Sequence, residues 1–592
     1  MSYGSTAARR LVGSFFLAAA ACLMVRFATA SNPVPGSASD PPSHWREPSA
    51  LWLSPEGNTL FAACEKSGSI AVLDVAKRER VAEFTCGESL VAMAGTRDGQ
   101  TLLVVDAKAN ALLFIRRRGS ELTVTDSLPL PIKPACVVID ADDKTVFVTC
   151  VWSRQVVRVD LAERKIVGSI DLDYSPRTAR LLPDARTLAV ADAFADQLAL
   201  VDTTTGRVVR EVRIPGHNIQ GMAVSATGKE LLLSHMIQTE SAPITRDNVF
   251  WGIAMTSNIR VVPLAALADA NKNPVREAHT HFLGDPNNGA GDPGAVLTLA
   301  DGTTFVCLSG VGEVTIGRLT PYGLRRLRVG DRPVALVASP DEKTVFVANS
   351  HSDSISVIDV AKQAVTDTIA LGPGPSSSPV EQGERAYYDA RLSLDGWFSC
   401  NSCHTDGHTN GQRADTFGDG TYGAPKNVLS LLGTGHTEPW AWNGSKRQLE
   451  DQVRESLTHT MLPKTAPGER TRAALVAFMR TLEVPPAADW QRRDAAAIAR
   501  GEQVFTARRC ATCHAPPSYS NPFTYDVGLD DGDGGNRLFS PPSLRGVAHS
   551  APYFHDGRAA TLEDVFQKHQ HRLRTALSDE ELGDLAAFLR SL

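Results

Sequence analysis

The sequence predicts a multidomain protein, with an all-β propeller of about seven blades followed by two mainly α-helical domains. Three observations support this prediction: an internal repeat over 46–372, a Gly/Pro/Ser-rich stretch at 372–379, and apolar residues at helical spacing beyond it. The net charge of −6 over 592 residues is close to balance. It therefore indicates neither a nucleic-acid nor a membrane-surface partner.

The first 30 residues have the pattern of an export signal. Arginines at 9–10 precede an apolar run at 11–25, which ends near an Ala-x-Ala site at 28–30. The run is too short for a typical membrane-spanning helix. We expect cleavage after Ala30, a periplasmic mature protein and no stable membrane span in that form. An uncleaved N-terminal anchor is the alternative interpretation.

The N-terminal half repeats a unit of three recognisable strands. Clear copies lie at 50–84, 137–170, 179–212 and 335–369, and the third strand of each ends in an aspartate: Asp74, Asp160, Asp202 and Asp359. We expect these aspartates to cap turns. A period near 40 with short strands is typical of propeller blades, because one small sheet cannot bury both of its faces alone.

Seven blades fit into 46–372, which we assign to the propeller. The fifth carries an insertion near 237–257, and the sixth is entered through a Gly/Pro/Asn-rich loop at 284–294. The repeats resemble the YVTN-type β-propeller family. That resemblance implies a fold rather than a function, because propellers host many activities.

Two Cys-x-x-Cys-His motifs follow the propeller. In the first, Cys400 and Cys403 precede His404; in the second, Cys510 and Cys513 precede His514. This pattern attaches a c-type haem: two thiols bond to the porphyrin and the histidine binds iron. A four-thiolate zinc site or a dithiol redox centre is the alternative. Haem is attached outside the cytoplasmic membrane, so the motifs agree with the export signal.

The helical half is predicted as a linker at 373–384, a first c-type haem domain at 385–484 and a second at 490–592. Apolar spacing predicts helices at 449–457, 470–482, 495–505, 562–569 and 578–592. Ser578 and Glu581 form a capping box at the start of the last one. In both domains a proline-rich loop, an aromatic-x-Gly turn and a Leu-Glu-Asp helix follow the haem motif, which indicates a duplication.

The segment PSLRGVAHSAPYFHDGRAATLEDVF at 542–566, together with an upstream WNG and LEDQ, resembles the bacterial dihaem cytochrome c peroxidase/MauG superfamily. The resemblance covers roughly 385–592. It implies two covalently bound c-type haems that lie close together, with one storing an electron while the other meets peroxide. It also implies a redox partner protein, and hydrogen peroxide or an oxidisable substrate.

The resemblance also implies roles for single residues. His404 and His514 would be the proximal iron ligands, and Trp442 in the Trp-Asn-Gly turn would relay electrons between the haems. His555 matches a histidine that contacts a haem propionate. His569 falls where relatives place a sixth ligand of the second haem, and His571 is its rival for that place.

The sequence departs from the family in its first haem domain. The stretch at 414–423 lacks the usual distal histidine, and the acid expected after the first Leu-Glu-Asp helix is missing. His459 is a substitute for the proton-moving group that peroxide cleavage requires. His408 and His436 are candidates to ligate or line the first haem. The asparagine of the inter-haem calcium site is replaced near Gly423, which leaves calcium held by carbonyls near Ser550 and Pro552 as an open prediction.

We therefore expect an exported dihaem oxidoreductase of the peroxidase/MauG type. The alternative is an electron-transfer dihaem cytochrome in which the propeller is a docking domain and peroxide is not consumed. A scaffold protein dominated by the propeller, with vestigial haem sites, is the third hypothesis.

Overall fold

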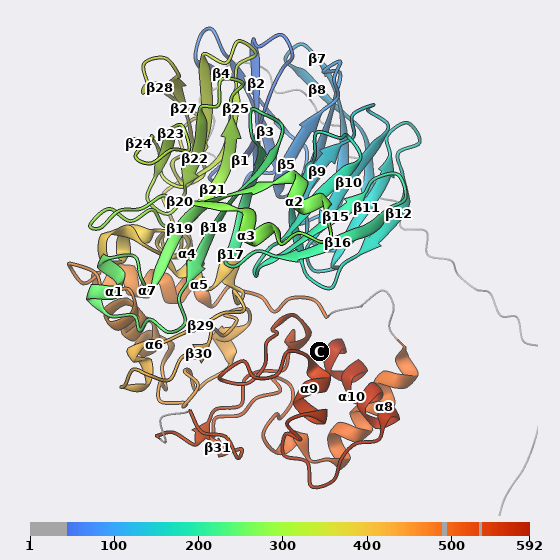
Figure 1. The fold of residues 1–592 in the computed structure, drawn as a ribbon, viewed down its shortest axis with the longest axis vertical. Coiled ribbons are helices and arrows are strands. Elements are labelled where there is room, and N and C mark those ends of the chain that lie inside the picture. Colours follow the sequence, from blue (N-terminus) through green and yellow to red (C-terminus); the bar gives the residue numbers. More distant parts are fainter. Residues whose placement is uncertain (1–43, 488–493, 532–534) are drawn as a thin grey trace, which may run out of the picture. The chain divides into compact units, whose positions relative to one another are not determined.

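The computed structural model describes residues 44–487, 494–531 and 535–592 (Figure 1). The predicted signal peptide at 1–30 lies outside these residues. Within them, no helix combines the length and the apolar character that crossing a membrane requires.

The N-terminal part is a seven-bladed propeller, as predicted. Each blade is an antiparallel four-stranded sheet in which the strands pair in chain order. The strands are β1 Pro48–Leu53, β2 Thr59–Cys64, β3 Ser69–Asp74, β4 Glu79–Thr85; β5 Leu90–Gly95, β6 Thr101–Asp106, β7 Ala111–Arg118, β8 Glu121–Pro129; β9 Pro134–Ile139, β10 Thr145–Cys150, β11 Gln155–Asp160, β12 Lys165–Asp171; β13 Pro176–Leu181, β14 Thr187–Asp192, β15 Gln197–Asp202, β16 Arg207–Arg213; β17 His217–Val224, β18 Glu230–Gln238, β19 Met255–Pro263, β20 His279–Phe282; β21 Pro293–Thr298, β22 Thr304–Leu308, β23 Glu313–Gly317, β24 Leu324–Arg328; β25 Pro333–Ala338, β26 Thr344–Asn349, β27 Ser354–Asp359 and β28 Ala364–Ala370.

Burial explains why the blades need one another. The second and third strands of the first blade are almost wholly buried, whereas its outer strand β4 is largely exposed. Apolar side chains of neighbouring blades meet in shared clusters, and one of these joins Leu60 and Ala62 of the first blade to Phe346 and Ala348 of the seventh. This contact closes the ring of blades.

The aspartates that recur in the repeat cap turns, as expected. Asp74 accepts a hydrogen bond from the Lys77 backbone N–H, and Asp359 accepts one from that of Lys362. The fifth blade carries the predicted insertion, which holds the short helix α1 Arg246–Phe250 between β18 and β19. Two further short helices, α2 Leu264–Ala268 and α3 Pro274–Glu277, connect β19 to β20.

The C-terminal part is mainly helical, as predicted. Its helices are α4 Pro379–Tyr387, α5 Cys400–Cys403, α6 Leu449–Glu455, α7 Glu469–Met479, α8 Ala495–Ala507, α9 Leu562–Gln567 and α10 Asp579–Ser591. Two small hairpins, β29 Arg413–Ala414 with β30 Lys426–Asn427 and β31 Tyr525–Asp526 with β32 Leu538–Phe539, lie between them. The predicted capping box of Ser578 and Glu581 is present at the start of α10.

Two helices differ from the sequence prediction. Helix α4 begins inside the expected linker, because Pro379 occupies the first helical turn and Ser378 forms a capping box with Glu381. Helix α6 ends at Glu455 and continues as a single π-helical turn over Ser456–Thr460.

The duplication is visible in two helix pairs, α4 with α7 and α8 with α10. A glycine lies at each crossing: a Cβ on Gly383 would stand 1.9 Å from the Ala474 carbonyl oxygen, and one on Gly501 would stand 2.0 Å from that of Asp584. Only a residue without a side chain permits this backbone approach. Each of the two domains therefore contains a helix pair that crosses closely at a glycine.

Candidate haem centres

The first Cys-x-x-Cys-His motif forms helix α5. Ser399 and Ser402 close a capping box at its start, and His404 follows directly at its end. The His404 Nδ1 lies 2.8 Å from the Leu429 carbonyl oxygen, which leaves Nε2 as the nitrogen free to bind iron. Desolvation by the surrounding protein lowers the pKa of His404 to about 4, so the imidazole is neutral and able to act as a ligand.

A largely apolar cavity of about 390 Å³ adjoins this motif. Its walls include Cys400, Cys403 and His404. The two thiols are free rather than joined in a disulfide, and burial raises the pKa of each to about 12. Free paired thiols, a neutral imidazole and an apolar cavity are the environment that a covalently attached haem requires.

Propeller residues contact the first motif and the segment just after it. Buried Asp292, in the loop that enters the sixth blade, accepts hydrogen bonds from the hydroxyls of Ser399 and Ser402, the latter at 2.7 Å. His217 of β17 places its Nε2 3.0 Å from the Ser402 carbonyl oxygen. Arg177 pairs with Asp406, two residues beyond His404. Three blades thus fix one short segment.

The insertion of the fifth blade forms part of the same cavity. Ile244 lines it, donates its backbone N–H to the Asp415 carbonyl at 2.8 Å, and accepts a hydrogen bond from the Tyr422 hydroxyl. Val249 and Met255 belong to one hydrophobic cluster with side chains of helices α6 and α7. The propeller and the first haem domain therefore share a core.

The second motif begins just after helix α8 as a short 3₁₀ turn, Cys510–Thr512. The His514 Nδ1 lies 3.1 Å from the Tyr519 carbonyl oxygen, which is the arrangement seen at His404. His571 is partly buried. Burial, and to a smaller extent the charge of His514, lower the pKa of His571 to about 4. His569 instead turns its Nε2 toward the Arg558 carbonyl at 3.3 Å.

Trp442 and His555 come together between the two domains. Trp442 lines the cavity and donates its indole N–H to the Asn427 carbonyl at 2.8 Å, while its ring centroid lies 6.4 Å from that of buried His555. His555 stacks on Phe539 and places its Nε2 3.0 Å from the Asp530 carbonyl oxygen.

Asn427, which was not predicted as a site residue, links the first haem domain to loops of the second. Its backbone N–H donates to the His555 carbonyl, and its side-chain amide donates to the Pro552 carbonyl, both at 2.6 Å. Its Oδ1 is buried, and no residue in the described part of the chain forms a hydrogen bond with it. Asn427 thus lies beside the Pro552 carbonyl, one of the groups that the sequence analysis gives as a candidate calcium ligand.

The remaining predicted histidines lie outside the first cavity. His459 is exposed on the π-helical turn, with its Nδ1 3.0 Å from a Glu455 carboxylate oxygen. His408 is buried with both ring nitrogens engaged, by the Ser430 hydroxyl and the His549 carbonyl. His436 is exposed.

Two polar side chains of α6 do line that cavity, and neither was predicted. Glu455 contacts Lys446 as well as His459, and the Oε1 of Gln452 is buried without a hydrogen-bond partner in the described residues. The signal was available in the sequence, because positions 452 and 455 are three apart and therefore share a helix face.

Comparison with known proteins agrees with this geometry. Residues 377–483 match the family model described as di-haem cytochrome c peroxidase, 498–592 match cytochrome c, and 56–180 match a YNCE-like β-propeller. The methylamine utilization protein MauG of Methylorubrum extorquens is 28% identical over 290 residues, covering 37% of this chain and 81% of the relative. Cytochrome c551 peroxidase of Nitrosomonas europaea is 25% identical over 36% of this chain and 79% of its own length. Cytochrome c peroxidase Ccp of Escherichia coli is 24% identical over 42% and 66%.

Proposed function

We propose that the site at His404 is the reactive centre of this protein. The chain is a dihaem peroxidase/MauG-like oxidoreductase joined to a β-propeller. Cys400 and Cys403 would anchor its haem, and Cys510, Cys513 and His514 would hold the second. When bound, the two haems would supply one-electron redox chemistry at iron. The observation that carries the proposal is the apolar cavity shared by His404, its two thiols and Trp442.

Trp442 is the proposed electron relay between the two centres. Its indole is fixed by the Asn427 carbonyl, and Asn427 also binds loops of the second domain through His555 and Pro552. One residue therefore sets the position of the relay relative to both domains. His555 would support this arrangement by packing against the relay and by contacting a haem propionate.

Glu455 is the proposed proton-moving group of the reactive centre. It lines the cavity and contacts exposed His459, so the pair forms a route for a proton between the cavity and solvent. A positioned acid or base of this kind contributes roughly 10²–10⁴-fold to a rate. In this proposal His459 acts through Glu455, not on the substrate directly.

A second ligand and a cation complete the proposed site. Of the two candidate sixth ligands of the second iron, His571 is supported by its place beside His514, whereas His569 engages a backbone carbonyl. Calcium between the domains is supported by the buried, unpartnered Oδ1 of Asn427 near Pro552. Carbonyl and amide oxygens are ligands that calcium prefers.

We further propose that the mature protein is periplasmic and exchanges electrons with a redox partner protein. Hydrogen peroxide or an oxidisable substrate would react at the first centre. The test is to mix reduced holoprotein with hydrogen peroxide and follow both haem absorbance and peroxide loss. Turnover that Glu455→Gln strongly reduces is the expected result. Absence of peroxide consumption would overturn the peroxidase assignment.

The electron-transfer alternative has one specific observation in its favour. Among the described residues that line the first cavity, His404 is the single histidine, so the usual distal imidazole is missing there. Under this alternative the holoprotein is reduced quickly by a partner dehydrogenase and does not react with peroxide. An electron paramagnetic resonance spectrum with two low-spin ferric signals and no high-spin signal would select it.

A further inference from the structure

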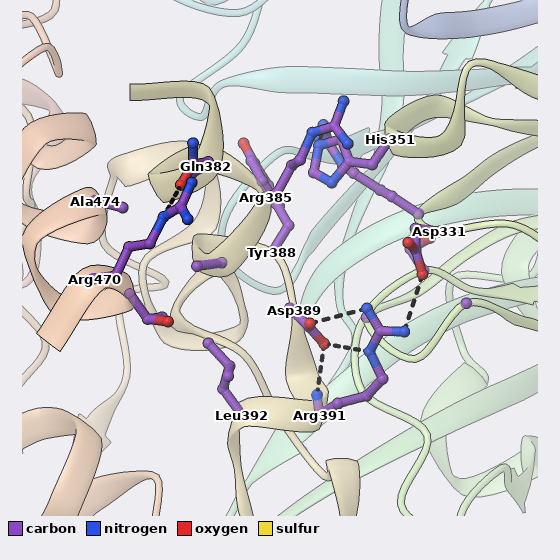
Figure 2. A pocket seen from close by; sticks show the side chains of 16 residues that line it. Asp331, His351, Gln382, Arg385, Tyr388, Asp389, Arg391, Leu392, Arg470 and Ala474 are labelled. Atoms are coloured by element: carbon purple, nitrogen blue, oxygen red, sulfur yellow. Dashed lines mark hydrogen bonds and ion pairs between the residues drawn. The ribbon is translucent and has the colours of Figure 1, made fainter. Parts of the chain in front are cut away.

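A second pocket, separate from the haem cavity, lies where the propeller meets the first haem domain. It encloses about 330 Å³ (Figure 2). One wall comes from propeller loops at 309–312 and 331–332, together with His351. The opposite wall comes from helices α4 and α7. Neither the haem motifs nor the proposed proton route uses this pocket.

Arginines dominate its charged lining. Two carboxylates, Asp331 and Asp389, face four arginines, so the lining carries an excess of two positive charges. The arginines are Arg332, Arg385, Arg391 and Arg470. Arg391 binds both carboxylates, with Nη1 3.0 Å from Asp331 and Nε 2.7 Å from Asp389 (Figure 2). The acidic groups of the pocket are therefore already engaged by one of the four cations.

None of the other three arginines forms a close ion pair with a described carboxylate, although Glu65, Glu47 and Glu384 act on Arg332 from farther away. Arg470 Nε donates to the Gln382 side-chain oxygen at 3.0 Å. Arg332 lies 3.7 Å from the centre of the Tyr388 ring, and Arg385 lies 4.4 Å from that of Trp45. An aromatic face attracts a guanidinium but accepts few of its N–H groups.

Arg385 carries the strongest sign of a missing partner. Its Nε and Nη2 atoms are buried, and neither forms a hydrogen bond with any described residue. Burying charged donors without acceptors is unfavourable, so such groups are normally paired in a folded protein.

We propose that this pocket binds a small oxyanion, a carboxylate or a phosphate, through the guanidinium groups of Arg385 and Arg470. The planar fork of arginine matches both oxyanions, and charge-assisted hydrogen bonds to it are among the strongest in proteins. The volume is at the lower end of ligand pockets, which suits a small metabolite or an inorganic ion. The ring of Tyr388 contacts Arg332, and its hydroxyl donates to Asp406 at 3.2 Å, which connects the lining of this pocket to the first haem segment.

The test is calorimetric titration of the oxidised holoprotein with sodium phosphate and, in a second arm, sodium malonate. Ionic strength is held constant with sodium chloride. We expect one saturable site for at least one anion, and the arm that binds identifies the chemistry. Arg470→Gln should weaken binding about tenfold or more, because it removes a charged donor that is otherwise tied only to a neutral amide.

Arg472→Gln is the matched control, because Arg472 lies on the same helix, pairs with Glu469 and does not line the pocket. It should leave the dissociation constant within about twofold of the parent protein's. Arg385→Gln is a second pocket variant, used once its haem absorbance and circular dichroism match the parent. No saturable binding in either arm, or equal binding by Arg470→Gln and Arg472→Gln, would overturn the proposal.

Discussion

Replacing Asp292 by alanine should loosen the first haem domain, although Asp292 belongs to the propeller. The buried carboxylate accepts hydrogen bonds from Ser399 and Ser402, the two residues that cap helix α5. Hydrogen bonds to a charged group contribute about 1.5–3 kcal/mol each, so the pair contributes roughly 3–6 kcal/mol. Removing the carboxylate also relieves its burial, which itself costs several kcal/mol.

We expect a net loss of about 2–3 kcal/mol, since the two hydroxyls stay buried without their acceptor. The helical part at 379–592 falls in the size range of 150–250 residues, for which each kcal/mol of lost stability lowers the melting temperature by roughly 2–4 °C. Thermal unfolding of the holoprotein, followed at the haem absorbance, should therefore shift down by about 5–10 °C. Asp292→Asn keeps one acceptor oxygen and should lose about half as much.

Asp173→Ala is the control, because Asp173 is an exposed propeller aspartate. It should melt with the parent protein. If Asp292→Ala melts within about 1 °C of that control, the propeller does not support the haem segment in the way the contacts indicate.

Three further predictions follow from single contacts. Glu455→Gln should lower peroxide turnover roughly 10²–10⁴-fold while leaving the absorbance of both haems unchanged; unaltered turnover would exclude its proton role. Gly501→Ala should destabilise the second haem domain by about 1–3 kcal/mol in chemical unfolding, because the new Cβ meets the Asp584 carbonyl. Its control is Gly583→Ala on α10, whose Cβ meets nothing within 4 Å and which should be neutral or slightly stabilising. Burial raises the pKa of Glu47 in the folded protein to about 8, above its ordinary 4.5, so its contribution to stability is full below pH 4.5 and is lost as the pH rises toward 8. Glu47→Gln should flatten that part of the curve of stability against pH. An unchanged slope would contradict the assignment.

The propeller could be predicted from sequence because its information is local. Strand alternation, the turn after each second strand and an aspartate such as Asp74 repeat at one period, and each repeat reports its own blade. The same is true of helix α10, which Ser578 marks through its capping box. Helix α4 was missed because proline and serine residues were interpreted as a linker, although Pro379 and Ser378 also begin helices well.

The contacts between propeller and haem domain could not be predicted. Asp292 lies 107 and 110 residues from the two serines that it binds, and nothing in a propeller loop distinguishes it from other solvated aspartates. His217 and Arg177 are likewise ordinary until the fold brings them to 402 and 406. Such residues are identified only by burial, which depends on the tertiary structure.

Within the candidate site, motif spacing specified the groups that could anchor the cofactors but not the groups around them. Cys-x-x-Cys-His predicts His404 and His514 as the proximal ligands, since the pattern encodes the attachment chemistry itself. Motif spacing does not distinguish His569 from His571, because the direction of the chain after helix α9 decides where each side chain points. Glu455 is not predicted by the family pattern, because that pattern places an acid after the helix, whereas Glu455 is the last residue of helix α6 itself.

Intact mass measurement of the mature protein, followed by peptide mapping, tests the central claim most directly. We predict two covalently attached haems per chain, one on the peptide containing Cys400 and Cys403 and one on the peptide containing Cys510 and Cys513. A mature chain whose four cysteines are unmodified, or occupied by zinc, would contradict the account and leave a propeller with no redox centre.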